Sequence, residues 1–153
     1  RTGFWNRRQG LDIRAQLGSD RPDIVVMTGG GNDLGERCGC RTGCAAEVDA
    51  LLTEDGGGAF GDFLSEVVAD GTQVFVLGYP DPPAGGNDFS GCVADLRVLA
   101  GRLDAMEGVT IVPSHQAIDR GDISYYDADR VHPSIKASSV MAKLLADAIA
   151  ASP

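Results

Sequence analysis

Residues 22–34 read PDIVVMTGGGNDL and place three consecutive glycines directly after a short apolar run. The run at 23–27 has the length and composition of a buried β-strand. Glycine loses more backbone freedom on folding than any other residue, so three in succession indicate a special need of the backbone there. Asn32 and Asp33 follow where the strand must end. They predict either a helix cap or Asx-turn, or a polar functional site.

Two further apolar runs of strand length lie at 73–77 and 109–113, and none of the three alternates cleanly between apolar and polar residues. Each strand is therefore expected to be covered on both faces, as in a parallel sheet. Apolar residues at helical spacing lie before, between and after them. The predicted helices span 7–18, 45–52, 60–68, 89–103 and 141–149, and the last begins near Pro133 or Ser134. This alternation predicts an α/β class, a three-layer α/β/α sandwich with a parallel sheet.

In open parallel sheets the chemistry gathers beyond the carboxyl ends of the strands. Three segments leave the predicted strands at that edge: TGGGNDLGE at 28–36, GYPDPPAGG at 78–86, and residues 114–133. Asn32 therefore lies on the edge where a site is expected. Tyr79 follows the second strand and is a candidate for shaping the mouth of that site.

The chain has 153 residues, a net charge of −9 and 43% hydrophobic residues. This length suits a single domain over 1–153. The acidic balance argues against a nucleic acid partner and against docking on anionic lipid. No apolar run approaches the roughly 20 residues needed to cross a bilayer, so no membrane span is expected.

The four cysteines are Cys38, Cys40, Cys44 and Cys92. Three of them crowd into CGCRTGC, and no C-x-x-C pair is present, which argues against a zinc site. An even count with one distant member favours two disulfides, for which four cysteines allow three arrangements. We expect Cys40 to pair with Cys44 and Cys38 with Cys92, with free thiols and zinc as alternatives. Disulfides imply an oxidising compartment, periplasmic or secreted.

The segment DADRVHPS at 127–134 carries a second chemical signal. Asp129 precedes His132 by three residues, just ahead of the last predicted helix. A carboxylate so placed can fold back onto the histidine Nδ1–H, fix the tautomer and stabilise the imidazolium that forms during proton transfer. A histidine by itself is commonly a surface or core residue, but His132 has an acidic partner on the expected active edge. Asp127 is a second candidate for that partner.

These stretches together resemble the conserved blocks of SGNH (GDSL-type) hydrolases. PDIVVMTGGGNDL is similar to the third block, a strand followed by G-x-N-D, and DRVHPS is similar to the fifth block, D-x-x-H before a C-terminal helix. Gly3 lies 29 residues before Asn32, which is similar to the family's spacing between the second-block glycine and the third-block asparagine. The resemblance runs along essentially the whole chain and implies the flavodoxin-like fold of this family.

The resemblance implies acyl transfer on carboxylic esters. In the family a serine attacks the ester, and a histidine takes the serine proton and later protonates the leaving alcohol. Carried over to this chain, His132 is the base, Asp129 orients it, and Gly3 and Asn32 donate hydrogen bonds to the oxyanion. Asparagine suits this task because its amide is a neutral donor on a short stem. No metal or cofactor is expected.

The nucleophile is missing from this pattern. No GDS motif occurs in the chain, and the family's serine would lie upstream of Gly3. Ser19, Ser114 and Ser134 are poor substitutes by their predicted positions. Since the sequence opens on Arg1, we expect the serine on an upstream segment that has been lost, or on another chain that complements this one. Without the strand that precedes such a serine, 23–27 would expose an unpaired apolar edge, and the chain would not catalyse by itself.

Other interpretations stay open. GGGND is similar to the G-D-G-x-N-D metal motif of haloacid-dehalogenase-like phosphatases, but Gly30 stands where that motif has its metal-binding aspartate. An inactive SGNH-like binding or structural domain is a second alternative. Trp5 and Tyr79 are candidate substrate-binding residues. Family members act on lipids, lysophospholipids or carbohydrates, and some are acyltransferases. The sequence shows no large apolar lid, which favours small or carbohydrate-linked esters.

Overall fold

The computed structural model of the chain describes residues 12–19, 21–40 and 43–152. Within these residues three parallel strands form one sheet in the order β1-β2-β3. The strands are β1 (Ile24–Met27), β2 (Gln73–Leu77) and β3 (Val109–Val112). All three lie inside the apolar runs from which they were predicted. The predicted α/β class with a parallel sheet is therefore confirmed.

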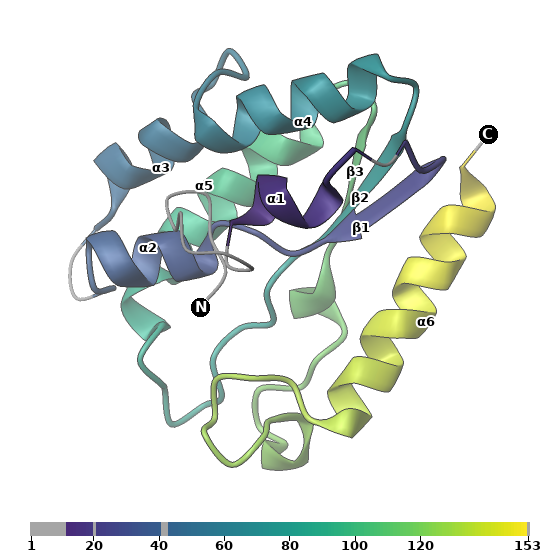
Figure 1. The fold of residues 1–153 in the computed structure, drawn as a ribbon. Coiled ribbons are helices and arrows are strands. Elements are labelled where there is room, and N and C mark those ends of the chain that lie inside the picture. The colour runs from purple at the N-terminus through teal and green to yellow at the C-terminus, as the bar shows by residue number, and fades with distance from the viewer. Residues whose placement is uncertain (1–11, 20, 41–42, 153) are drawn as a thin grey trace.

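Helices flank this sheet on both faces (Figure 1). They are α1 (Ile13–Leu17), α2 (Gly31–Arg37), α3 (Ala45–Leu51), α4 (Ala59–Ala69), α5 (Val93–Asp104) and α6 (Ile135–Ala151). The helices α3, α4 and α5 lie on one face, and α6 lies on the other. These are the three layers that the alternation of strands and helices predicted.

Two apolar cores fill the spaces between the layers. The larger core lies under α3, α4 and α5 and contains Val74 and Val76 of β2. The smaller core lies under α6, where Leu77 of β2 packs with Ala137 and Met141. Because side chains alternate along a strand, β2 supplies both cores, which explains why its sequence shows no polar face.

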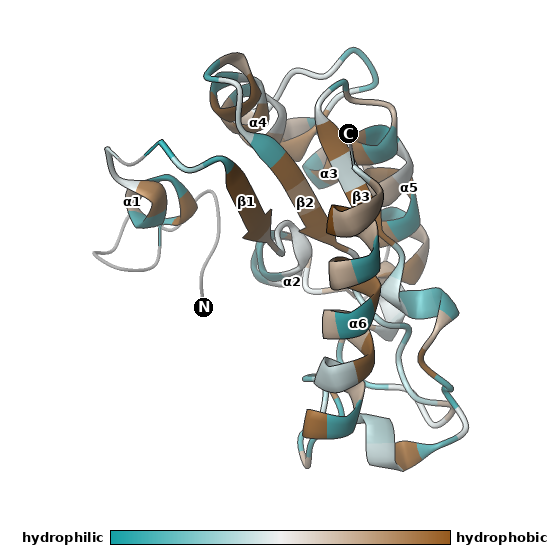
Figure 2. Ribbon diagram, turned by 90° about the vertical axis from the view of Figure 1, so that its right-hand side faces the viewer, coloured by the Kyte–Doolittle hydropathy of each residue, from teal (hydrophilic) through white to brown (hydrophobic). Residues whose placement is uncertain are grey.

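Strand β1 is covered on one face only by the described helices. Val25 and Met27 pack into the larger core. Ile24 and Val26 point the other way, and 39% and 44% of their surfaces are exposed. Figure 2 shows why: α6 stands over the β3 side of the sheet and does not reach β1. Strand β1 therefore presents an apolar surface next to an edge of the sheet.

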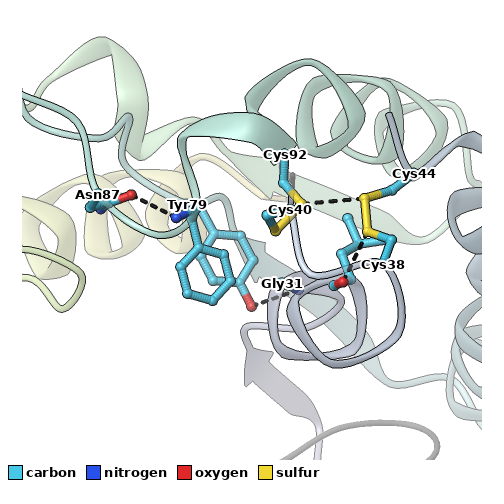
Figure 3. Close-up of a disulfide and its surroundings, with 9 residues drawn as sticks. Gly31, Cys38, Cys40, Cys44, Tyr79, Asn87 and Cys92 are labelled. Atoms are coloured by element: carbon cyan, nitrogen blue, oxygen red, sulfur yellow. Dashed lines mark hydrogen bonds between the residues drawn. A yellow bond between two sulfur atoms is a disulfide. The ribbon is translucent and has the colours of Figure 1, made fainter. Parts of the chain in front are cut away.

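Two disulfides join the segments around α2, α3 and α5 (Figure 3). The short-range disulfide is Cys38–Cys44, with a sequence separation of 6, and the long-range disulfide is Cys40–Cys92, with a separation of 52. The predicted pairing, Cys40–Cys44 with Cys38–Cys92, is wrong. Cys38 ends α2 and Cys44 precedes α3, so the turn between the two helices brings these two together.

Cys40 lies in that turn with a φ of 51°. This left-handed backbone conformation is rare for residues other than glycine, and sequence spacing does not reveal it. Cys40 thereby bonds to Cys92, at the start of α5. The two disulfides are compatible with an extracellular or secreted protein.

The first and last helices, α1 and α6, have these bounds and caps in the structure. Helix α6 begins at Ile135, and the Ser134 hydroxyl caps it by accepting a hydrogen bond from the Ala137 main-chain N–H at 3.3 Å. Of the helix predicted at 7–18, the described part is α1, and residues 7–11 lie outside the described ranges. Within the described residues, no helix has both the length and the apolar character to cross a membrane.

Candidate active site

A cavity of about 650 Å³ opens at the carboxyl edge of the sheet. Its walls come from the segments that follow all three strands, as expected for a parallel sheet. Asn32, Tyr79 and His132, three of the residues predicted from the sequence, line it. These residues are 47 and 53 positions apart in sequence (32 to 79, 79 to 132), so the fold brings them together.

His132 and Asp129 form the predicted pair. The His132 Nδ1 lies 2.5 Å from one carboxylate oxygen of Asp129, and the other oxygen accepts hydrogen bonds from the main-chain N–H groups of Val131 and His132, each at 2.9 Å. The main-chain and ring hydrogen bonds from His132 lower the pKa of Asp129 to about 2. The carboxylate is therefore ionised at neutral pH and fixes the ring through Nδ1, which leaves Nε2 for proton transfer.

A short closed loop presents this pair. Tyr126 and Pro133 form an antiparallel bridge, and the Asp127 N–H donates to the His132 carbonyl oxygen at 2.8 Å. Arg130 turns the chain with a φ of 60°. The Asp127 carboxylate accepts a hydrogen bond from the Ala128 N–H at 2.7 Å, within the loop's own backbone. The carboxylate that contacts the His132 ring is that of Asp129.

Asn32 lies in the first turn of α2, where a loop was predicted, and its side chain is half-buried against the cavity. The helix begins immediately after Gly30, which has a φ of 92°. A Cβ on Gly30 would collide with Leu99 of α5, so glycine is needed both for its conformation and for the approach of α5. The start of α2 therefore explains the need for glycine at position 30, and Asn32 still lines the cavity.

Tyr79 lines the cavity and also makes a contact that the sequence did not indicate. Its hydroxyl accepts a hydrogen bond at 3.1 Å from the N–H of Gly31 (Figure 3), the residue that precedes Asn32 in the chain. A Cβ on Gly31 would lie 2.6 Å from the Tyr79 ring, so the ring needs a glycine there. Burial raises the pKa of Tyr79 to about 12, which keeps the phenol neutral. Tyr79 therefore both lines the cavity and supports the turn that carries Asn32.

Gly3 and Trp5, predicted as an oxyanion donor and a substrate-binding residue, lie outside the described residues. The serines considered as substitutes are poorly placed for catalysis. Ser114 is fully buried, and the Ser134 hydroxyl donates to the Ser124 carbonyl oxygen at 2.6 Å. Ser19 precedes β1 and so lies toward the opposite edge of the sheet. Within the described part of the chain, no serine lines the cavity.

Sequence reasoning did not single out two charged or titratable residues that line the cavity, His115 and Arg97. His115 lies in a short 3₁₀ helix (Ser114–Gln116) directly after β3 and lines the cavity. Burial and the neighbouring Arg97 charge lower its pKa. Arg97 of α5 also lines the cavity and forms an ion pair with Asp81 at 2.5 Å. The position of His115 after a strand was a usable signal, whereas nothing in the sequence around Arg97 pointed to the cavity.

One group of potential metal ligands occurs in the described ranges: Cys38, Cys44 and Cys92, with sulfur atoms within 4.8 Å of one another. All three belong to the disulfides, together with Cys40. A thiolate is needed for zinc binding, so the disulfides replace the zinc alternative weighed from the sequence.

Comparison with solved structures finds a fold similar to that of the lipase Lip_vut3 from a goat rumen metagenome, with a TM-score of 0.63. The similarity covers 90% of this chain and 72% of the lipase chain, at 16% sequence identity. At this identity the similarity shows that the two chains share a fold. No family model and no curated protein sequence matches the chain.

Proposed function

We propose that this chain supplies the general base and an oxyanion donor of a serine ester hydrolase of the SGNH (GDSL) type. The observation that carries the proposal is the His132–Asp129 pair, which opens on the same cavity as Asn32. A histidine fixed by a carboxylate through Nδ1 is the arrangement that a general base requires. The similarity to a lipase fold supports the same class of enzyme.

In the proposed reaction a serine hydroxyl attacks the ester carbonyl carbon while His132 takes its proton at Nε2. The carbonyl oxygen becomes an oxyanion, and the Asn32 amide donates a hydrogen bond to it. The bond to the alcohol then breaks, and the proton on His132 passes to the leaving oxygen. A water molecule hydrolyses the acyl-serine by the same steps, again with His132 as the base.

The serine is proposed to arrive on a segment that adds a strand to β1. The apolar surface of Ile24 and Val26 supports this idea, because exposed apolar strands at a sheet edge invite a further strand. A strand added parallel to β1 would have its carboxyl end at the edge of the sheet where Asn32 lies. The segment is either part of the same polypeptide or a second chain.

A catalytically inactive binding domain is the second candidate function. One observation favours it: within the described residues, the cavity has Asn32 and His132 but no serine. Both candidates are compatible with a periplasmic or secreted protein, as the disulfides suggest.

The test is to purify the natural protein with any segment that accompanies it, and to treat it with a fluorophosphonate probe. We expect hydrolysis of p-nitrophenyl acetate in the presence of EDTA, together with a probe adduct on a serine outside residues 12–152. A His132→Ala variant is expected to lose both turnover and labelling, because the serine then lacks its base.

Intact mass separates the two candidates. A species of 15.9 kDa without turnover or label would contradict the hydrolase and support the binding domain. Ester turnover that stops when EDTA is added would instead point to a metal-dependent enzyme.

A further inference from the structure

One face of α5 extends the cavity away from His132 and Asn32. Six residues of this helix line it: Val93, Leu96, Arg97, Ala100, Gly101 and Asp104. They recur at intervals of three and four, so they form a continuous stripe along the helix. From the first to the last, the stripe spans about 16 Å at the rise of an α-helix. The cavity is therefore an elongated groove with the candidate active site at one end.

The floor of this groove is mostly apolar. Leu96 and Ala100 of α5 face it together with Ile111 of β3 and Phe89, which precedes α5. Two charged residues of α5 line it: Arg97, which is paired with the Asp81 carboxylate at 2.5 Å, and Asp104 at the far end of the stripe. A neutral, unbranched hydrocarbon chain fits such a surface, whereas a sugar chain needs many hydrogen-bond partners.

Gly101 is the unusual residue of the groove. It lies inside α5, where glycine is the least favourable residue after proline. Its φ is not in the left-handed region, and a Cβ at this position would have no atom within 4 Å. Neither backbone conformation nor packing therefore calls for glycine. Its effect is to leave the wall of the groove open.

We propose that the groove along α5 binds the acyl chain of the ester and that Gly101 sets the length of chain it accepts. This inference rests on the proposed function, since it takes the ester group to lie beside His132 and Asn32. It replaces the preference for small or carbohydrate-linked esters with a preference for unbranched acyl chains.

The test is isothermal titration of the chain with methyl butanoate, hexanoate, octanoate and decanoate, because binding needs no nucleophile. We expect the dissociation constant to fall about fourfold with each methylene buried in the groove. Gly101→Phe is expected to weaken the binding of the longest ester most, because Gly101 lies about 12 Å along α5 from Val93, and Gly101→Ala to weaken it less. Both variants should fold at least as stably as the wild type, because alanine and phenylalanine are better helix formers than glycine.

Val98→Phe is the matched control. Val98 lies on the same helix outside the groove, with 49% of its surface exposed, so this variant should keep the full dependence on chain length. A dissociation constant that does not change with chain length, or one that Gly101→Phe and Val98→Phe alter equally, overturns the inference. Tighter binding of xylobiose than of decanoate overturns it as well.

The titration tests the groove and the hydrolysis assay tests the hydrolase, so either proposal can be contradicted without the other. Chain-length dependence without ester turnover by the natural protein overturns the hydrolase and supports an acyl-binding groove. Turnover with equal kcat/KM for all chain lengths overturns the groove and supports the hydrolase.

Discussion

Tyr79→Phe removes one oxygen atom from the support of the turn that carries Asn32. In the wild type the Gly31 N–H donates to that oxygen at 3.1 Å, and the Tyr79 ring packs on the glycine. The phenylalanine ring keeps the packing but leaves the N–H without this acceptor. The change therefore removes the hydrogen bonds of one hydroxyl, the one from Gly31 and the one with Thr28, next to the candidate oxyanion donor.

The lost hydrogen bonds and the raised pKa of Tyr79 together set how much the substitution changes the free energy of unfolding at each pH. Near neutral pH, the loss of a partly buried hydrogen bond of this kind costs about 1–2 kcal/mol in the free energy of unfolding. The pKa of Tyr79 rises from 10.0 to about 12 in the folded protein, so folding favours the neutral phenol. That contribution is complete below about pH 10 and is lost as the pH rises toward about 12, at about 1.4 kcal/mol per pH unit. Near pH 11 the wild type should have lost about as much stability as the substitution removes.

The assay is urea unfolding of wild type and Tyr79→Phe near neutral pH and near pH 11, with the difference between the two proteins compared. We expect a gap of about 1–2 kcal/mol near neutral pH that closes near pH 11. Tyr125→Phe is the control, since the Tyr125 ring contacts Lys136 through its face, which phenylalanine retains. Equal stability of wild type and Tyr79→Phe at neutral pH, or a gap that does not change with pH, would refute the reasoning.

Three further predictions concern the disulfides, Asp129 and the exposed face of β1. Replacing both cysteines of the long-range disulfide with alanine should lower the free energy of unfolding by about 4 kcal/mol, and the same change in the short-range disulfide by about 2 kcal/mol. The two values differ because the disulfides join residues 52 and 6 positions apart, and chemical unfolding measures both. The pKa of the Asp129 carboxyl, measured by carbon NMR, should be about 2 and should move toward the ordinary 3.8 in His132→Ala, which lacks the ring hydrogen bond. The stabilisation of the fold by this carboxylate is present above about pH 4 and is lost as the pH falls toward 2. Val26→Lys should change the free energy of unfolding of this chain by less than about 0.5 kcal/mol, because Val26 is 44% exposed. The same variant should reduce co-purification of a serine-bearing segment, because it places a charge where the added strand would pack.

The main features of the fold could be predicted because the strands are short, apolar and separated by helices of clear periodicity. Phe60, Phe63, Leu64 and Val67 follow helical spacing and are all buried in α4. The His132–Asp129 pair was also predictable, since the two residues are three positions apart and a local turn brings them together.

Features that depend on distant contacts were harder to predict. The disulfide pairing depends on the left-handed backbone of Cys40, and the helical start at Gly31 depends on Gly30 fitting against Leu99. The role of Tyr79 arises from a hydrogen bond between residues 48 positions apart. Local sequence patterns carry no information on such contacts.

The central claim is that His132 serves as the general base of an ester hydrolase, and the most direct measurement is kcat for p-nitrophenyl acetate in the natural protein and in His132→Ala. His115→Ala is the comparison, because it removes the other histidine of the same cavity. The account predicts that His132→Ala lowers kcat by at least about 10²–10⁴-fold and His115→Ala by far less. Turnover that survives His132→Ala, or that falls equally in both variants, would contradict the claim.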